Sequence, residues 1–229
     1  MSLKSIFVVA CLCVVTLGVL SCADVPSTAP EIPDFRTQTR FINAYPGAAS
    51  VEILLEPTSN AGLNSFATVD FQGDTGYQDV PAGNRKMKLQ SDPDTTSIGL
   101  ESDGKITIVV MPKGAPSDPR FRKFTERRTF DALPSDVGQV RFINAAVGGN
   151  FDVLDTSDST VVAKGVGFGS SSGYVSLAAG SFTFGIAPKA TQNVLATVQV
   201  TLSNSQRFTA VVLGDQASPA VKAFQDDPQ

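Results

Sequence analysis

Three short motifs carry residue types that enzymes and metal sites use. Residues 169–173, Gly-Ser-Ser-Ser-Gly, match the nucleophile-elbow pattern of serine hydrolases. Residues 74–76, Asp-Thr-Gly, match the triplet of aspartic proteases, which need two carboxylates that share a proton. Asp152, Asp155 and Asp158 recur at every third residue, and clustered oxygens of this kind can bind Ca²⁺.

The rest of the sequence gives these chemistries little support. The chain has no His, so a serine nucleophile lacks its usual base. An internal repeat, described below, places Ser-Ser-Gly at residues 171–173 opposite residues 74–76, so only a homodimer could bring two Asp74 together. The three aspartates lack the alternating spacing and closing Glu of an EF-hand. We expect Asp152 on a strand and Asp158 in a turn, and solvated turn residues rather than a Ca²⁺ site. We predict no catalytic residue, no metal and no cofactor.

A basic run is the strongest candidate for a binding surface. Residues 120–128 hold five of the 17 basic side chains that lie beyond residue 21, interleaved with Phe. We predict that Arg122, Lys123, Arg127 and Arg128 contact an anionic surface, with lipid or glycan favoured over protein. The alternative is a charged edge strand, because Lys and Arg commonly protect sheet edges from pairing.

Composition favours an all-β chain without nucleic-acid partners. Beyond residue 21, 17 basic side chains stand against 22 acidic ones, a net charge of −5 and no general footprint for nucleic acid. Trp is absent, which weakens a sugar-stacking interpretation. Short apolar runs alternate with Gly and Pro turns, and no long stretch has helical periodicity.

The chain contains an internal duplication. Arg-Phe-Ile-Asn-Ala occurs twice, and the alignment continues through later segments with length changes only between expected strands. The matched segments are 40–44 with 141–145, 50–54 with 150–154, 71–83 with 168–180, and 106–110 with 208–212.

Each copy reads as six or seven short strands, the size of a Greek-key sandwich. Arg85, Met87 and Leu89 alternate with polar residues, which predicts a strand lying on a core. We predict an all-β protein with two tandem immunoglobulin-like or transthyretin-like Greek-key β-sandwiches, with Phe71 and Phe168 in equivalent core positions. The expected domains are 40–131 for copy 1, 132–140 for the linker and 141–229 for copy 2.

The N-terminus resembles a bacterial lipoprotein signal. Lys4 precedes the apolar run Ile6–Leu20, which is too short for a comfortable membrane span of about 20 residues. The run ends in Val-Leu-Ser before Cys22, similar to a lipobox, which implies cleavage after residue 21 and lipidation of Cys22. Two alternatives remain: cleavage after Ala23 by an ordinary signal peptidase, and an uncleaved helix.

Residues 22–39 are expected to form an extended tether. They contain Pro26, Pro30 and Pro33 and hardly any apolar periodicity. At roughly 3.1 Å per residue, such a segment could hold a folded domain up to about 50 Å from a bilayer.

The two copies resemble the bacterial family named domain of unknown function 4397. The resemblance rests on Arg-Phe-Ile-Asn-Ala at the start of each copy, the segments 77–83 and 174–180, and the closing aliphatic strands. Residues 45–47, Tyr-Pro-Gly, keep the family pattern after the first motif, whereas residues 146–148, Ala-Val-Gly, depart from it. The resemblance implies secreted or lipid-anchored envelope proteins, often with tandem copies, and brings no catalytic residues.

Together these features predict a non-enzymatic, lipid-anchored cell-envelope protein that acts in binding, adhesion or envelope structure. Its membrane would be the outer one if the host has two. The expected partners are the membrane, through the lipid anchor, and an envelope glycan, anionic lipid or surface protein. The alternative is a small-ligand or glycan receptor with a site between the two domains.

Overall fold

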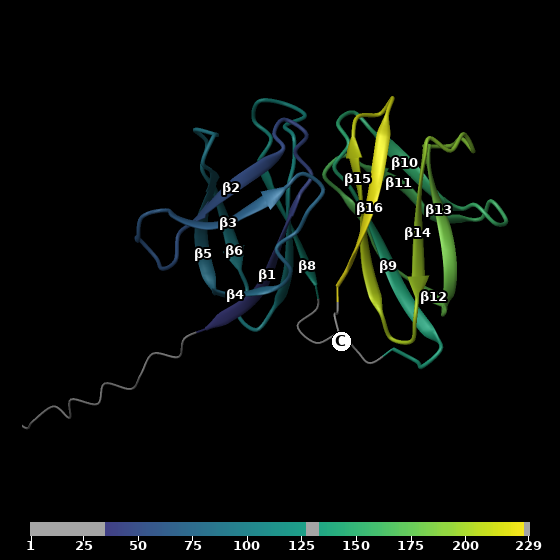
Figure 1. Ribbon diagram of the computed structural model, residues 1–229, viewed down its shortest axis with the longest axis horizontal. Coiled ribbons are helices and arrows are strands. Elements are labelled where there is room, and N and C mark those ends of the chain that lie inside the picture. Colours follow the sequence, from purple (N-terminus) through teal and green to yellow (C-terminus); the bar gives the residue numbers. More distant parts are fainter. Residues whose placement is uncertain (1–34, 127–132, 227–229) are drawn as a thin grey trace, which may run out of the picture. The chain divides into compact units, whose positions relative to one another are not determined.

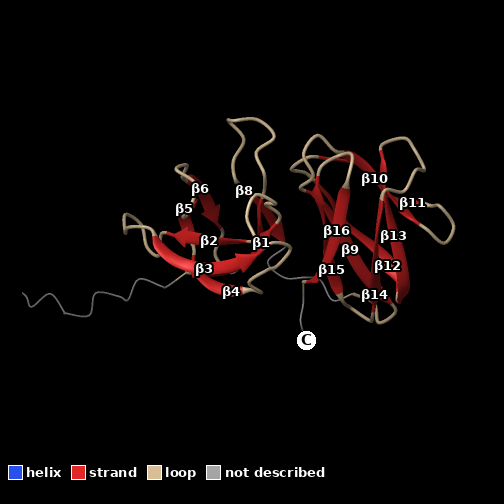
Figure 2. Cartoon of the chain, turned by 45° about the horizontal axis from the view of Figure 1, so that its top comes forward, coloured by secondary structure: helices blue, strands red, loops and turns tan. Residues whose placement is uncertain are grey.

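The computed structural model describes residues 35–126 and 133–226. These residues form sixteen β-strands and no helix (Figure 2). In the strand Gly83–Leu89, the side chains of Arg85, Met87 and Leu89 are buried and Lys86 is exposed, as the alternating pattern predicts. Within the described ranges, no helix is long and apolar enough to cross a membrane.

The first eight strands build one β-sandwich, which we call the first sandwich (purple to teal in Figure 1). Its two sheets have the strand orders β4-β1-β7-β8 and β3-β2-β5-β6. The strands are β1 (Arg36–Asn43), β2 (Ser50–Leu55), β3 (Asn64–Asp70), β4 (Gln78–Pro81), β5 (Gly83–Leu89), β6 (Thr96–Leu100), β7 (Lys105–Val110) and β8 (Phe121–Glu126).

The next eight strands build the second sandwich (green to yellow in Figure 1) with the same arrangement. Its sheets have the orders β12-β9-β15-β16 and β11-β10-β13-β14. The strands are β9 (Val137–Asn144), β10 (Asn150–Asp155), β11 (Val161–Gly167), β12 (Ser171–Ala178), β13 (Gly180–Pro188), β14 (Ala196–Leu202), β15 (Arg207–Gly214) and β16 (Pro219–Gln225).

The strand order distinguishes between the two predicted sandwich types. β1 and β9 each pair in parallel with a later strand, β7 and β15 respectively. In the immunoglobulin constant-type order the first two strands share a sheet, whereas here β1 and β2 lie in different sheets. The order therefore leaves the transthyretin-like alternative. Each copy has eight strands rather than six or seven. In the first copy, β4 has only four residues and is too short for a periodicity signal.

Each sandwich has its own hydrophobic core. Phe41 on β1 and Phe142 on β9 are fully buried in the two clusters. Phe41 packs against Phe66 with ring centres 5.4 Å apart, and Phe142 meets Phe184 edge-on at 5.2 Å. Such aromatic pairs add directional packing to a large buried apolar area.

The prediction that Phe71 and Phe168 are core residues is wrong. They do occupy equivalent places, each in the turn directly after an aligned strand, β3 or β11. Both are only half-buried, and neither belongs to the core clusters. β3 and β11 end one residue before them, so neither side chain is directed into a core by a strand. The phenylalanines at equivalent core positions are Phe41 and Phe142.

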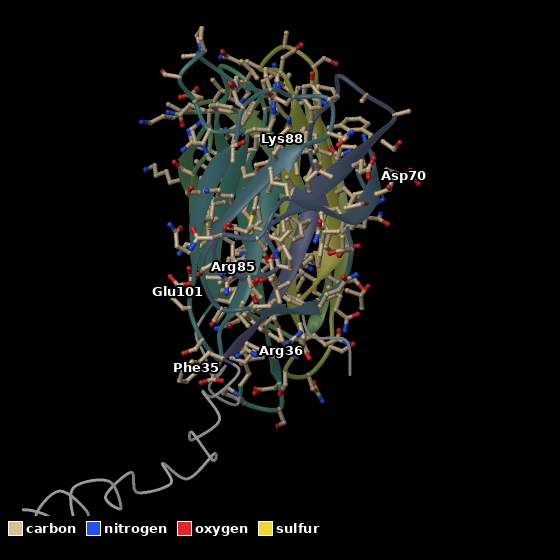
Figure 3. All side chains as sticks on the ribbon, turned by 90° about the vertical axis from the view of Figure 1, so that its left-hand side faces the viewer. Phe35, Arg36, Asp70, Arg85, Lys88 and Glu101 are labelled. Carbon is tan, nitrogen blue, oxygen red and sulfur yellow. The ribbon has the colours of Figure 1, made fainter. Side chains whose placement is uncertain are left out.

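The described chain begins at Phe35, and β1 begins at Arg36, inside the predicted tether (22–39). Phe35 and Arg36 lie together at one end of the first sandwich, with Lys88 of β5 toward the other end (Figure 3). β9 likewise begins at Val137, inside the predicted linker (132–140).

Candidate functional site

The repeated motif Arg-Phe-Ile-Asn-Ala lies on β1 and β9, which run through the middle of their sheets. Successive side chains on a strand point to opposite faces of the sheet. Phe41 and Phe142 therefore enter the two cores, while Arg40 and Arg141 point to the other face. That outer face is also buried, since both arginines are at most 3% exposed.

The motif asparagines tie the two sheets of each sandwich together. Asn43 Nδ2 donates to the carbonyl of Val69 at 3.0 Å, and Asn144 Nδ2 donates to that of Val166 at 2.9 Å. Each asparagine side-chain oxygen also accepts from the amide two residues on, a local turn in which the backbone is satisfied.

The faces that carry the two arginines pack against each other. Ile42 of β1 and Ile143 of β9 are fully buried in a third apolar cluster, built from both sandwiches. We call this contact the junction. Its other members also come in aligned pairs: Ala44 with Ala145, Val109 with Val211, Met111 with Leu213, and Phe124 with Phe224. A contact between equivalent faces is the pattern of a two-fold symmetric interface.

Two ion pairs cross the junction in opposite directions. Arg40 of the first sandwich pairs with Asp226 of the second. Arg141 of the second sandwich pairs with Glu126 of the first, with Nη2 and Oε1 2.5 Å apart. All four side chains are at least 96% buried. Each sandwich therefore supplies one arginine and one acid, and each charge is neutralised by the opposite copy.

Two threonines lie between the charges. Thr107 Oγ1 donates to Glu126 at 2.7 Å and accepts hydrogen bonds from both arginines. Thr209 Oγ1 donates to Asp226 at 2.8 Å and accepts from Arg141 Nε at 2.8 Å. These hydroxyls join the two ion pairs into one network, which satisfies most of the buried polar atoms.

Two tyrosines close the network at equivalent positions. Tyr77 donates its hydroxyl to Glu126, and Tyr174 donates to Asp226 at 2.7 Å. Each ring also lies under the arginine of its own sandwich, 4.8 Å and 4.9 Å from the guanidinium carbon. A guanidinium over an aromatic face is attracted by the negative face of the ring.

The environment fixes the protonation of these groups. Burial raises the pKa of Tyr77 and Tyr174 well above the usual value, and the nearby carboxylates raise it further. Burial by itself lowers the pKa of Arg40, but Asp226, Tyr77 and Glu126 together outweigh this, and its pKa is raised. The tyrosines are thus neutral donors and the arginine a cation throughout the physiological pH range.

The network has two unsatisfied atoms on its first-sandwich side. Glu126 Oε2 and Arg40 Nε are buried and have no hydrogen-bond partner. On the other side, both oxygens of Asp226 accept hydrogen bonds, and Arg141 Nε donates to Thr209. The junction is symmetric in its residues but not in its hydrogen bonding.

This arrangement suits structural specificity rather than reaction chemistry. The carboxylates are held by arginine, threonine and tyrosine donors, so neither is presented as a free base. Removing one partner of a buried pair leaves an uncompensated charge, at a cost of about 3–5 kcal/mol. A shift in the packing of the two sheets would separate both pairs, so the network specifies one alignment.

Two of the enzyme-like motifs prove to be the same structural device. Thr75 Oγ1 accepts a hydrogen bond from the amide of Phe41 at 3.0 Å and donates to the carbonyl of the next glycine. Ser172 Oγ does the same for Phe142, also at 3.0 Å. The two following glycines have φ of 64° and 73°, in the left-handed region that favours glycine. Both hydroxyls thus pair an amide of the motif strand.

The three spaced aspartates also serve the backbone. The expectation of a solvated side chain is wrong for Asp152, which is buried on β10 and accepts from the amides of Gly165 at 2.6 Å and Ala190 at 2.8 Å. Asp155 and Asp158 each accept from the amide two residues on, as in Asx turns. Among the described residues, no three acidic, His or Cys side chains gather in a way that could hold a metal ion.

The predicted anionic-surface residues are partly engaged within the chain. Lys123 Nζ lies 2.6 Å from Glu101 Oε1, across the first sandwich. Arg122 lies 5.9 Å from the ring centre of Phe168 in the second sandwich and is about 30% exposed. β8 thus uses both residues to bridge neighbouring elements. Arg127 and Arg128 lie outside the described residues, as does Cys22.

A cavity of about 640 Å³ lies beside the junction and is lined by both sandwiches. Lys123 and Glu126 of β8 line one side, and Arg141 and Arg207 of β9 and β15 line the other. Its walls are mostly polar. The volume falls in the range of about 300–1,000 Å³ that small-ligand sites have.

Sequence reasoning missed the roles of Arg40, Glu126 and Asp226. The signal was present in part, because an arginine directly before Phe-Ile on a strand must find a partner if both faces of the sheet are buried. Glu126 and Asp226 also fall opposite each other when the last strands of the copies are aligned. What the sequence does not reveal is that the two sheets face each other.

The fold and the junction define a tandem β-sandwich protein whose copies pair through equivalent faces. The model of the family called Domain of unknown function (DUF4397) matches the chain twice, at residues 37–154 and 138–229. The chain therefore belongs to this family, in tandem copies, as the resemblance implied. No curated protein matches the chain.

Several solved structures are similar at low identity. The Bacillus anthracis TIE protein is 11% identical over 81% of this chain and 34% of its own, with a TM-score of 0.27. A leucine-rich repeat protein of Bacteroides thetaiotaomicron is 10% identical over 81% and 26%, with a TM-score of 0.21. A proposed cell adhesion protein of Bacteroides fragilis is 7% identical over 85% and 98%, with a TM-score of 0.22. The chain spans about a third or less of the first two. At these TM-scores the similarities carry no argument about function.

Proposed function

We propose that the protein is a non-enzymatic, lipid-anchored component of the cell envelope that acts in binding, adhesion or envelope structure. The observation that carries the proposal is that the hydroxyl and carboxylate groups of the enzyme-like motifs and of the junction are bound within the fold. Thr75 and Ser172 pair with strand amides, and the buried acids Glu126 and Asp226 neutralise arginines at the junction. A pair of sandwiches joined by a buried network and carried on a tether is suited to presenting a surface at a distance from a membrane.

The anchor is tested on the mature protein isolated from its host. We expect the chain to begin at Cys22 with a mass increased by diacylglyceryl and acyl groups, since two or more chains give stable membrane anchoring. Cys22→Ser should move the protein out of the membrane fraction. An unmodified mature chain that starts at Ala23 or Asp24 would contradict the anchor.

The binding partner favoured by charge is an anionic envelope surface, lipid or glycan. The basic run on and after β8 supports this, because Arg122 and Lys123 keep roughly 30% of their side chains exposed despite their internal contacts. We expect the unlipidated chain to bind vesicles that contain anionic lipid. Binding should weaken as the salt concentration rises, because at physiological ionic strength exposed charges are already screened beyond about 8 Å.

A matched control separates this surface from net charge. Arg127→Glu with Arg128→Glu should weaken vesicle or polysaccharide binding, whereas Lys86→Glu with Lys88→Glu, on β5, changes the net charge equally and should not. Equal binding by all three forms would make the basic run edge protection only. Capture of a surface protein by crosslinking in intact cells would replace the lipid or glycan with a protein partner.

A small-ligand or glycan receptor is the second candidate, and the cavity beside the junction favours it. Its polar walls and its position between the sandwiches fit a polyhydroxylated ligand. The test is calorimetric titration of envelope glycan fragments into the unlipidated chain. Ser171→Trp, at the cavity wall, should abolish binding, and Ser181→Trp, an exposed change on β13, should not. Binding unaffected by Ser171→Trp would exclude the cavity.

A further inference from the structure

Each junction face carries both halves of the charge pattern. The first sandwich presents Arg40 and Glu126, and the second presents Arg141 and Asp226 at the aligned positions. The apolar residues around them are likewise equivalent or similar in the two copies. A face that presents a cation and an anion in this way is complementary to any other face of the same kind, whichever chain supplies it.

We infer that the junction faces form a dimerisation surface for a second copy of this chain. In the dimer, the first sandwich of each chain packs on the second sandwich of the other. Arg40 then pairs with Asp226 of the other copy, and Arg141 with its Glu126. The dimer contains two junctions, each with the contacts that a single chain makes once. Reciprocal exchange closes the assembly, so it stops at two chains rather than growing into a filament.

The connection between the sandwiches decides between the two forms. Only residues 127–136 separate the end of β8 at Glu126 from the start of β9 at Val137. A connection that spans the sites gives the intramolecular junction an effective concentration near millimolar, and one that cannot span them gives almost none. Because both forms make the same junction contacts, shortening the connection shifts the balance without altering the faces.

The first experiment deletes residues 127–132 from the unlipidated chain and measures molar mass by light scattering at micromolar concentration. We expect twice the monomer mass. The control replaces the same six residues with Gly and Ser and should keep the monomer mass. Asp226→Asn in the deletion background should raise the dimer dissociation constant at least tenfold. A folded deletion chain that stays monomeric would overturn the proposal.

A second experiment covers the case in which the deletion chain does not fold. A protease site replaces residues 127–132 in the full chain, which is folded first and cut afterwards. Isotope-labelled and unlabelled cut proteins are then mixed and followed by native mass spectrometry. We expect labelled first halves paired with unlabelled second halves, and pairs of two first halves through Arg40 and Glu126. Halves that separate into monomers on cutting would overturn the proposal.

Discussion

Glu126 and Asp226 occupy equivalent positions in the two sandwiches but are bound differently. Asp226 uses both oxygens, one for Arg40 and the other for Tyr174, with Thr209 donating to both. Glu126 directs every described donor to Oε1 and leaves Oε2 buried without a partner. The extra methylene of glutamate changes where the carboxylate sits against the same three kinds of donor.

The comparison shows that a symmetric set of residues need not be energetically symmetric. A buried polar atom without a partner costs about 1–3 kcal/mol, whereas a satisfied one contributes modestly. Each ion pair contains one such atom, Nε of Arg40 or Oε2 of Glu126, but Asp226 itself accepts hydrogen bonds at both oxygens and should be the more costly carboxylate to remove. The side of the network built around Asp226 is the one whose loss should matter more.

The largest expected effect comes from Asp226→Ala. This change leaves the fully buried Arg40 with only a longer ionic contact to Asp74, at 3.9 Å, and should lower the free energy of unfolding by about 3–5 kcal/mol. Glu126→Ala should cost less, because it also removes a buried oxygen that has no hydrogen-bond partner, whereas both oxygens of Asp226 are bonded. Urea unfolding followed by circular dichroism measures both.

Asp158→Ala is the control, because Asp158 lies in an exposed turn and should change the free energy of unfolding by less than about 0.5 kcal/mol. Equal losses for the two junction variants would remove the energetic difference between the sides. A larger loss for Glu126→Ala would reverse it.

The next largest effect is a loss of stability at high pH, to which both sides of the network should contribute. The pKa of Tyr77 and Tyr174 is raised in the folded chain, so the folded state keeps protons that the unfolded state loses near pH 10. Their contribution to the free energy of unfolding is complete below pH 10. Above pH 10 it falls, by about 1.4 kcal/mol for each tyrosine at pH 11. Tyr77→Phe with Tyr174→Phe should flatten this loss between pH 9 and 11 in urea unfolding. An unchanged slope would mean that the buried hydroxyls are not the groups responsible.

The smallest effect concerns the two hydroxyls that pair with the motif strands. Thr75→Ala and Ser172→Ala should each cost about 1 kcal/mol, the net worth of one hydrogen bond to a backbone amide. Thr75→Ser and Ser172→Thr each introduce the hydroxyl residue that the other copy uses. Their thermal unfolding midpoints should stay near that of the wild type. A hydroxyl exchange as costly as the alanine change would show that the copies need different side chains there.

Much of the fold could be predicted, because it depends on local patterns that the duplication repeats. The alternation through Arg85, Met87 and Leu89 predicted β5, and the repeated apolar run 106–110 lies on β7, a strand in the middle of its sheet. The outward side of that run is buried by the other sandwich, a partner that no local pattern reveals. Phe71 was misplaced because aligned positions establish equivalence, not burial.

The site was less predictable because it depends on contacts distant in sequence. Arg40 and Asp226 are 186 residues apart and meet only when two sheets of different copies face each other. The hydrogen bonds that the conspicuous aspartates and serines make to backbone amides could be seen only in the folded chain. A local motif can show that a residue type is unusual at its position, but only the fold shows which group it pairs with.

The parallel pairing of β1 with β7 has a mechanical consequence. The two strands are in register over six residue pairs, from Gln38 with Lys105 to Asn43 with Val110. A force applied to the chain ahead of Arg36, along the axis of β1, acts in shear on all the hydrogen bonds between β1 and β7 at once. It does not break them one after another, as a force at right angles to the strands would. We expect single-molecule stretching from that end to show a higher rupture force than stretching at right angles to the strand. The strand that bears the motif is then also the one that resists tension first.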